Sequence, residues 1–275
     1  MGDLDTRYAV HPTELAVLTT AGLRARVLLD GLFAPGEARL ALAHEDRLVV
    51  GGVLTAAAPV PLPCPEELRA EELLDRREAG IVCLAGPGEV QAGGARHTME
   101  AEDVLYLGKG TGPVAFGGEG AAFYLVSTLA HAEHPAVLSR RDAADAVTLG
   151  EPEQANVRTI RKHVWSGGVQ SAQLAMGVTT LAPGSVWNTM PAHLHERRTE
   201  VYLYFGLPED QRVVHLCGRP DATRNLIVAD REAVISPPWS IHTGAGTSGY
   251  RFVWATGGEN LTYDDMDPVA TGDLR

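Results

Sequence analysis

The feature that most constrains the fold is the alternation of short apolar runs with glycine and proline. The chain of 275 residues contains 30 glycines and 17 prolines, scattered without a period, which is typical of many tight turns. The runs between them are rich in β-branched and aromatic residues, which favours strands. We therefore expect an all-β fold. The predicted strands lie at residues 46–55, 80–94 (two strands), 101–110, 121–127, 171–182, 186–188, 199–205, 213–217, 224–228, 233–236 and 250–255.

A faint internal repeat divides these strands into two series. Ala101–Gly110 can be laid over Arg231–Ser240, because each segment has an acidic residue, a short apolar strand and a turn. Repeats at this scale indicate duplicated units, so we expect two packed antiparallel jelly-roll barrels in one chain. The expected parts are an N-terminal arm, a first barrel, a connecting segment and a second barrel, at residues 1–40, 41–130, 131–165 and 166–275.

A few short helices are expected beside the strands. Thr13 is a suitable N-cap for a short helix near the N-terminus, and residues 23–33 fit a strand or a second short element. The charged segment Glu66–Arg77 has helical spacing and is expected to end near Gly80. The proline-rich residues 57–65 before it predict a loop, because proline cannot sit inside a sheet.

Charge and hydropathy exclude several classes of partner. The net charge of −12 argues against a nucleic acid or an anionic membrane. No apolar run reaches about 18 residues, and the N-terminus lacks the basic and apolar regions of a signal peptide. The three cysteines, Cys64, Cys83 and Cys217, are far apart, which argues against a disulfide framework. We expect a soluble protein, cytoplasmic if the cell is bacterial.

The segment Asn188–Phe205 carries the residues that predict chemistry. His193 and His195 are one residue apart, so in an extended chain their side chains point to the same face. Polar residues at a strand end would be the more common explanation of two such histidines alone. Glu200, at the start of the strand that follows, favours a metal site instead. Two imidazoles and a carboxylate suit a divalent ion such as zinc, iron, manganese or nickel.

A fourth ligand is expected further along the chain. His242 follows a proline-rich turn between the predicted strands 233–236 and 250–255. A surface-loop histidine explains this stretch equally well when it is taken alone, but beside the earlier cluster His242 is the natural fourth ligand. The other internal histidines considered lack convergent partners in the sequence and are expected to be structural. These are His97, His131, His134, His163 and His215.

The two histidine motifs resemble those of the cupin superfamily. The shared pattern is His-x-His, four residues, Glu, and then a distant proline-rich turn that ends in His. Two positions depart from it: Trp239 stands where the second cupin motif usually has glycine, and Gly184 lies further before His193 than in the usual first motif. The chain therefore resembles a divergent cupin branch.

The resemblance extends to the 5-keto-4-deoxyuronate isomerases, or 4-deoxy-L-threo-5-hexosulose-uronate ketol-isomerases. The matching stretches span nearly the whole chain and are more specific than the ligands alone. They are Leu74–Gly80, Val104–Gly110, Trp187–Arg198, Ile235–His242, Tyr263–Asp267 and the terminal Asp273–Arg275. This resemblance implies an aldose–ketose isomerase that converts 5-dehydro-4-deoxy-D-glucuronate to 3-deoxy-D-glycero-2,5-hexodiulosonate in the degradation of pectin and other uronates.

The resemblance also implies a cofactor and an assembly. Members of this family hold zinc with residues that match His193, His195, Glu200 and His242, which implies one Zn²⁺ per subunit. It further implies a two-cupin fold, a homohexamer and a small keto-sugar substrate. The counterpart of His242 in the first half falls near Gly112, so we expect the N-terminal barrel to carry no metal. The ligands do not identify the ion, because three histidines and a glutamate accept several.

The implied reaction removes a proton next to a carbonyl, and a divalent cation would stabilise the charge that develops on oxygen. Because Glu200 is expected to bind the metal, another residue must move the proton. Tyr202 and Tyr204 share its face of the strand and are the candidates, with core packing as the alternative explanation. The substrate carboxylate needs a cation, and a solvated surface charge is the alternative for each candidate. These candidates are Arg198, Lys162, Arg161 and Lys109.

Three other functions fit part of the pattern. The 5-deoxyglucuronate isomerase of inositol breakdown would share the chemistry and differ in its substrate pocket. A non-catalytic metal-binding cupin could be a sugar sensor or a storage protein. No DNA-binding segment or basic patch supports a regulator, and the metal site would be hard to explain in a storage protein. An iron-dependent cupin dioxygenase would consume oxygen.

Overall fold

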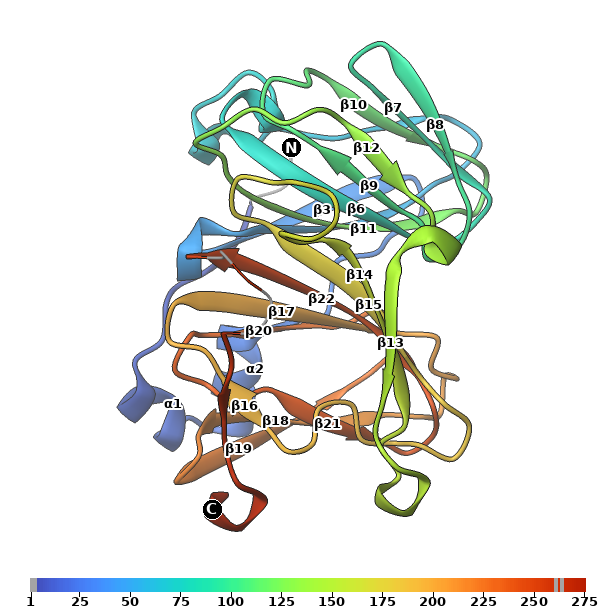
Figure 1. The fold of residues 1–275 in the computed structure, drawn as a ribbon. Coiled ribbons are helices and arrows are strands. Elements are labelled where there is room, and N and C mark those ends of the chain that lie inside the picture. The colour runs from blue at the N-terminus through green and yellow to red at the C-terminus, as the bar shows by residue number, and fades with distance from the viewer. Residues whose placement is uncertain (1–3, 260–261, 263–264) are drawn as a thin grey trace. The chain divides into compact units, whose positions relative to one another are not determined.

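The structure is a computed structural model that describes residues 4–259, 262 and 265–275. Strands dominate the fold (Figure 1), which confirms the all-β class. The chain divides into two compact units. The first comprises residues up to Thr6, Gly31–Asp145 and Lys162–Met176. The second comprises Arg7–Asp30, Ala146–Arg161 and Gly177–Arg275.

The first unit contains a seven-stranded sheet and a four-stranded sheet. Their strand orders are β1-β3-β4-β11-β6-β9-β12 and β5-β10-β7-β8. The strands are β1 Asp5–Arg7, β3 Glu37–Ala43, β4 Val49–Leu54, β5 Val60–Pro61, β6 Arg77–Ala85, β7 Gly88–Ala92, β8 Ala95–Met99, β9 Val104–Leu107, β10 Val114–Gly117, β11 Ala122–Leu129 and β12 Val137–Ser139.

An apolar cluster joins the two sheets of the first unit. Alternate residues of β6, namely Ala79, Ile81 and Cys83, pack in one cluster with Val90 of β7 and Phe116 of β10. Because strand side chains alternate with period two, these three residues point to the same face of β6. The space between these sheets is therefore filled by apolar side chains.

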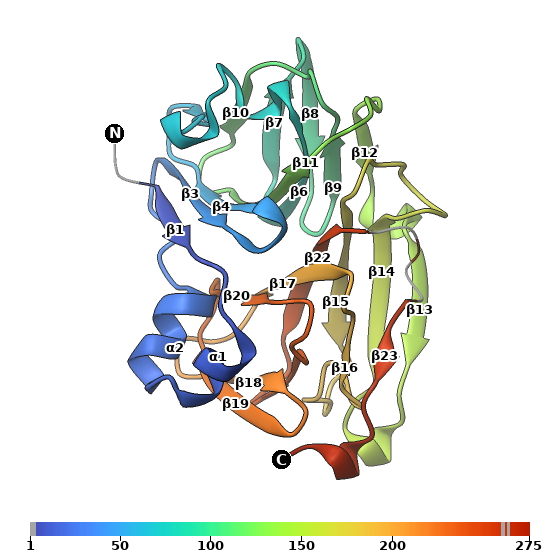
Figure 2. The same ribbon diagram turned by 90° about the vertical axis from the view of Figure 1, so that its left-hand side faces the viewer.

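The second seven-stranded sheet has the order β13-β14-β15-β22-β17-β20-β2 and is accompanied by the sheets β19-β18-β21 and β16-β23. The helix α1 contacts β18 and β19, and α2 contacts β2, β19 and β20 (Figure 2). The elements are α1 Pro12–Val17, α2 Thr20–Val27, β2 Leu28–Leu29, β13 Asp145–Leu149, β14 Arg158–Val164, β15 Ala175–Leu181, β16 His193–Leu194, β17 Arg198–Phe205, β18 Val213–Arg219, β19 Ala222–Val228, β20 Ala233–Ser236, β21 Thr243–Gly246, β22 Arg251–Gly258 and β23 Asp267–Pro268.

The two large sheets share a strand order, although the repeat laid out from the sequence was one residue out of register. The series β4-β11-β6-β9 corresponds to β15-β22-β17-β20. Val234 pairs with Tyr202, on the face of β17 that carries Glu200. In the first unit Leu105, not Val104, belongs to the apolar cluster between the sheets. Val234 therefore corresponds to Leu105, and aligning Val234 with Val104 had matched residues on opposite faces of the strand. That each pair of sheets closes into a jelly-roll barrel stays a prediction.

The helix predicted over Glu66–Arg77 was wrong. The segment forms two separate 3-10 turns, Glu66–Leu68 and Leu73–Asp75, and β6 begins at Arg77. Arg69 interrupts the first turn with a left-handed backbone, φ 50°. The Asp75 carboxylate then accepts hydrogen bonds from the backbone N–H of Glu71 and Glu72, the local competition that makes aspartate a poor helix residue.

Other helices and strands differ from the expectation in detail. The side chain that caps α1 is His11, which accepts from the N–H of Thr13, so Thr13 lies within the helix. Thr19 caps α2 by accepting from Gly22. The segment expected to be a simple connection contains β12, β13 and all of β14. All residues of β13 are exposed, which explains why no apolar alternation marked it. Among the described residues, no helix is long and apolar enough to span a membrane.

Glu78 fixes a loop of the first unit onto the large sheet. Its carboxylate is fully buried and accepts hydrogen bonds from the hydroxyls of Tyr106 and Thr128, at 2.6 and 3.0 Å. It also accepts three backbone N–H groups, those of residues 172, 173 and 174, at 2.7, 2.7 and 2.8 Å. A buried carboxylate is tolerated only when donors replace its water. These five donors are that replacement.

Replacing this carboxylate should loosen the loop. Glu78→Gln presents an amide NH₂ to donors, so we expect the free energy of unfolding to fall by about 2–4 kcal/mol. Backbone amides of residues 172–174 should exchange with deuterium faster, as measured by mass spectrometry. The control Glu89→Gln removes an ion pair with Arg96, whose side chain is 67% exposed, and should cost under about 1 kcal/mol. Equal exchange in both variants would contradict this assignment.

Candidate metal centre

Four metal-ligand side chains converge in the second unit. His193 lies on β16, Glu200 on β17 and His242 directly before β21, while His195 lies in the turn between β16 and β17. Their ligand atoms all lie within 4.8 Å of one another. The four residues that the sequence nominated for the metal are therefore brought together.

Three hydrogen-bonded ladders place these side chains. Glu200 is paired with Ser236 of β20 and with Thr256 of β22, so it is fixed in the middle of three strands. His193 is paired with Pro268 of β23. Short strand segments joined by a turn allow His193, His195 and Glu200 to face one point, as expected from their spacing.

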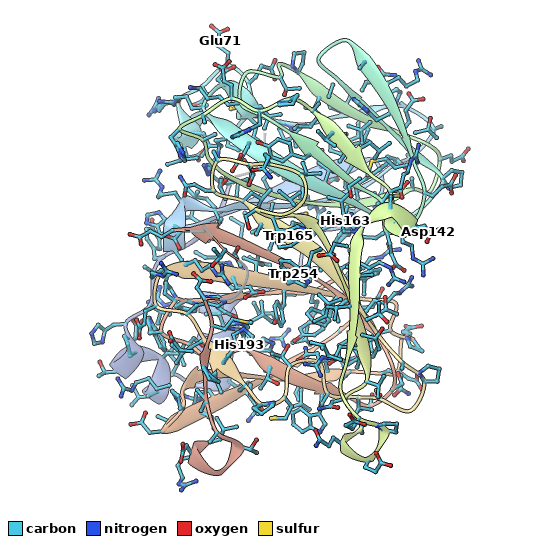
Figure 3. The ribbon with its side chains drawn as sticks, viewed as in Figure 1. Glu71, Asp142, His163, Trp165, His193 and Trp254 are labelled. Atoms are coloured by element: carbon cyan, nitrogen blue, oxygen red, sulfur yellow. The ribbon has the colours of Figure 1, made fainter. Side chains whose placement is uncertain are left out.

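The ligand atoms are close and mostly shielded from water. Glu200 Oε2 lies 2.8 Å from His195 Nε2 and 3.1 Å from His242 Nε2. The Nε2 atoms of His242 and His193 are 3.0 Å apart. His195, Glu200 and His242 are 2%, 5% and 1% exposed. His193, which Figure 3 labels, is the partly exposed ligand and marks the open side of the site.

Backbone carbonyls set the tautomers of two of the histidines. Nδ1 of His195 lies 3.1 Å from the carbonyl oxygen of Arg198, and Nδ1 of His242 lies 3.4 Å from that of Ser240. A carbonyl oxygen only accepts, so each Nδ1 must carry the proton that it donates. In the neutral rings the lone pair is therefore on Nε2, the atom that points at the other ligands. Hydrogen-bonded metal-ligating histidines are oriented in this way.

The resulting arrangement places hydrogen-bond acceptors, the imidazole Nε2 atoms and the Glu200 carboxylate, next to one another. Lone pairs of imidazole nitrogens and carboxylate oxygens repel one another at 2.8–3.1 Å unless protons or a cation lie between them. Ligand atoms about 2.0–2.1 Å from a zinc-sized ion are separated by roughly 2.9–3.4 Å at bond angles of 90–109°. Three of the observed separations, at 2.8–3.1 Å, are close to that range, and all four ligand atoms lie within 4.8 Å, so the group could hold a divalent cation.

The protonation states support the same conclusion. Burial, followed by the charge of His242, holds the pKa of His193 well below its ordinary value. Burial raises the pKa of Glu200, but the charge of His242 and the hydrogen bonds that His195 and His242 donate when they are protonated outweigh burial and hold this pKa well below its ordinary value. A neutral imidazole and an ionised carboxylate are the forms that bind metals.

Tyr202 is the phenol in contact with the ligand cluster. Its ring lies edge-on to that of His242, with centroids 5.3 Å apart. Its hydroxyl lies 3.3 Å from Thr189 Oγ1. Tyr202 is 3% exposed, so any proton it exchanges is shielded from bulk water.

Tyr204 belongs to a separate buried network that the sequence did not reveal. Its hydroxyl lies 2.7 Å from His215 Nδ1 and accepts from Asn188 Nδ2 at 3.2 Å. Asn188 Oδ1 also accepts from the N–H of Gly244, in the strand that follows His242. Asn188 thus ties the segment before His193 to the segment that carries His242. Neither Asn188 nor His215 could be selected from sequence, because their contact depends on which strands become neighbours.

Burial keeps both members of the Tyr204–His215 pair neutral. Burial, and secondarily the charge of His242, lowers the pKa of His215 to about 3. Burial raises the pKa of Tyr204. The hydroxyl of Tyr204 therefore donates to Nδ1 of His215 over the ordinary pH range.

Two of the cationic candidates, Arg198 and Lys162, already have partners. Arg198 is 3% exposed, and its Nη1 lies 2.7 Å from Asp265 Oδ1 and 2.8 Å from the carbonyl oxygen of Thr262. Lys162 belongs to the first unit, where its Nζ lies 2.7 Å from Asp145 Oδ2 and 3.9 Å from the ring centroid of Trp165, labelled in Figure 3. Their predicted roles in substrate binding stay predictions.

Two further predictions, the role of Arg161 and the matching stretch near the C-terminus, can be compared with the structure only in part. Nη1 of Arg161 is buried without a hydrogen-bond partner among the residues described, so its candidacy for the substrate carboxylate also stays a prediction. Tyr263 and Asp264, in the matching stretch near the C-terminus, lie outside the described residues.

Comparison with known proteins gives the family. Residues 32–270 match the KduI/IolB family. The chain belongs to that family. The resemblance inferred from the motifs is thereby confirmed, and the match covers both units.

Relatives are similar over their whole length. A Kineococcus radiotolerans protein is 47% identical over 279 residues, covering 99% of this chain and 100% of the relative. A Cereibacter sphaeroides protein is 48% identical over 275 residues, covering 100% of both. A Halalkalibacterium halodurans protein is 44% identical over 276 residues, covering 99% and 100%. Each is named 4-deoxy-L-threo-5-hexosulose-uronate ketol-isomerase.

Solved structures support the fold. An IolB-like protein from Salmonella typhimurium has a TM-score of 0.65 at 16% identity, covering 81% of this chain and 86% of that protein. An oxalate decarboxylase from Lactobacillus farciminis has a TM-score of 0.58 at 11% identity, covering 82% of each. At these identities the likeness shows the fold alone, which agrees with the cupin class expected from the motifs.

The buried histidine of the Tyr204 network should affect stability in acid. Between the unfolded pKa near 6.5 and the folded value of about 3, the unfolded chain binds the extra proton, so stability falls as the pH falls. We expect His215→Gln to remove about 1.4 kcal/mol per pH unit of this dependence between pH 6 and 4, measured by urea unfolding. His131→Gln, at an exposed histidine, is the control. An unchanged slope in His215→Gln would show that the histidine is not buried neutral.

Proposed function

We propose that the chain is a metal-dependent 4-deoxy-L-threo-5-hexosulose-uronate ketol-isomerase of pectin and uronate degradation, with 5-dehydro-4-deoxy-D-glucuronate as its substrate. The observation that carries the proposal is the convergence of three histidines and one glutamate within 4.8 Å. It occurs in a chain that is 44–48% identical, along its full length, to proteins of that name. The family resemblance also supports a homohexamer as the assembly.

Zinc is the proposed ion, with one per subunit. Three imidazole nitrogens and one carboxylate oxygen form a ligand set that zinc accepts. None of the chain's three cysteines is among the ligands, and neutral imidazoles leave more positive charge on an ion than thiolates do. When bound, the ion supplies Lewis-acid stabilisation of the charge that develops on the substrate carbonyl oxygen. The ligand set therefore favours a catalytic ion over a purely structural one.

Tyr202 is the proposed proton-transfer residue. Glu200 is one of the four ligands, and both neighbouring Nε2 atoms approach its Oε2, so it is poorly placed to act as a base. The Tyr204 hydroxyl is already used by Asn188 and His215. Tyr202 contacts His242 edge-on and presents its hydroxyl beside Thr189. A tyrosine in such a position accepts the proton from one carbon as the phenolate and, as the phenol so formed, returns it to the next carbon.

Arg198 is better suited to position the site than to bind substrate. Its charge is balanced by Asp265, and it opens the strand that carries Glu200 and Tyr202. Its carbonyl oxygen also accepts the Nδ1 proton of His195. We propose that the Arg198–Asp265 pair holds the start of β17 in place, which leaves Arg161 as the preferred candidate for the substrate carboxylate.

A 5-deoxyglucuronate isomerase is the second candidate function. It would share the chemistry, and the matching family carries two names, KduI and IolB. The full-length identity to ketol-isomerases favours the first activity. A substrate panel separates them: the purified protein is incubated with each deoxy-keto uronate, and products are followed by NMR with and without chelator. Turnover of 5-deoxyglucuronate alone would overturn the proposed substrate, and oxygen consumption would indicate a dioxygenase.

Loss of any ligand should remove metal and activity together. For His193→Ala, His195→Ala, His242→Ala and Glu200→Gln we expect less than one tenth of the bound metal, because three remaining ligands hold a divalent ion far more weakly. Ketol-isomerase turnover should fall by at least 10²-fold. Metal is measured by plasma mass spectrometry, with His131→Ala as the control at an exposed position. Normal turnover by metal-free protein would exclude this mechanism.

The two tyrosines should differ in their effect on turnover. Tyr202→Phe removes the proposed proton carrier while keeping the ring against His242, so we expect kcat to fall by about 10²–10⁴-fold with metal content unchanged. Tyr204→Phe removes a hydroxyl committed to Asn188 and His215, so it should lower stability by about 1–3 kcal/mol and kcat by less than tenfold. The reverse ranking of kcat would move proton transfer to the Tyr204–His215 pair.

A further inference from the structure

A cavity in the first unit is lined by four arginines. Its volume is about 280 Å³. The segment around Glu71, labelled in Figure 3, forms much of its wall. All of its lining residues belong to the first unit, whereas the four candidate metal ligands belong to the second. The lining residues are Arg47, Arg69, Arg76 and Arg77 with Glu67, Leu68, Ala70, Leu73 and Leu129.

None of the four guanidinium groups forms an ion pair within residues 4–259, 262 and 265–275. Glu67 also lines the cavity, without such a contact. Backbone carbonyls hold two of them instead. Arg76 donates to the carbonyl oxygens of Leu68 and Arg69, each at 2.6 Å, and Arg77 donates to that of Arg47. A carbonyl fixes a guanidinium in position but leaves its positive charge in place.

Arg77 is the arginine of this group whose burial costs the most free energy. It is 4% exposed, and its Nε is buried with no hydrogen-bond partner in the described part of the chain. Burial, and then the charge of Arg47, lowers its pKa to about 10. Burying a charge and leaving one of its N–H groups unpaired are both costly.

Arg198 in the second unit shows how the same position is balanced elsewhere. Arg77 opens β6 and Arg198 opens β17, the strands that occupy equivalent places in the two large sheets. Both arginines are buried, at 4% and 3% exposure. Arg198 has Asp265 as its counter-charge at 2.7 Å. Arg77 has three further arginines around it and an open cavity.

We infer that this cavity is a binding site for a small organic oxyanion, a sugar acid or a phosphate ester, with Arg77 at its base and Arg47 and Arg69 at its mouth. Arginine matches the planar, two-oxygen geometry of carboxylate and phosphate groups. Leu68, Leu73 and Leu129 provide apolar surface for a carbon skeleton. The site is additional to the candidate metal centre and does not depend on the proposed function.

Calorimetric titration of the intact protein tests the site. The probes are inorganic phosphate, galacturonate and, as the neutral control, glucose, each at low and at high salt. We expect saturable binding of one anion per chain, weakened by salt, and no binding of glucose. Tighter binding of galacturonate would indicate a sugar acid, and tighter binding of phosphate a phosphate ester. Absence of binding by both anions at 10 mM would overturn the inference.

Variants locate the binding to this cavity. Arg69→Gln and Arg47→Gln change exposed side chains, so both should fold, and each should weaken anion binding about tenfold. Arg96→Gln, at an exposed arginine of the same unit paired with Glu89, is the matched control and should bind normally. Arg77→Lys keeps the charge but loses the forked geometry and should bind more weakly still. Equal weakening in Arg96→Gln would show that the anion binds by general charge and would refute the site.

Discussion

The second unit is organised around the mutual repulsion of four ligand atoms. Three imidazole nitrogens and a carboxylate oxygen are held within 4.8 Å, and two of the nitrogens have their lone pairs directed inward by carbonyls bonded to Nδ1. Such a cluster persists only because the backbone leaves it no alternative. Glu200 is fixed between β20 and β22, and His193 is fixed by β23. A divalent cation converts this enforced repulsion into attraction, so metal binding and the stability of this region should be linked.

The polar groups behind the ligands have a different task. Asn188 bonds both to the strand that follows His242 and to Tyr204, so the segments that carry His193 and His242 cannot move independently. His215 completes this network as a neutral acceptor. A network in which each hydroxyl and amide has a partner is rigid in a low-dielectric interior. Rigid support of this kind is what a site requires if its geometry is to favour one transition state.

The ligands could be predicted because their signal is local, whereas much of the fold could not. A spacing of two residues places His193 and His195 on one face of an extended chain, and a turn before the next strand brings Glu200 to the same point, before any long-range contact is known. The helix predicted near Glu66 failed because Asp75 bonds to the backbone and because Leu73 and Leu74 are both drawn into the core. The repeat was misaligned by one residue because short apolar strands carry no register. Asp265 as the partner of Arg198, and the cluster of arginines around Arg77, join residues that only the fold makes neighbours.

The two large sheets share one strand order, but the side chains that they bury differ in polarity. In the face and register shared by β6 and β17, Ala79 occupies the place of Glu200, and Ile81 and Cys83 those of Tyr202 and Tyr204. Apolar side chains at these positions fill the first interior, so it needs no ion for stability. The buried arginine two residues earlier is common to both strands, but only Arg198 has a carboxylate partner. Retaining the buried charge of Arg77 without a carboxylate partner costs free energy, and an anion bound beside it would offset that cost.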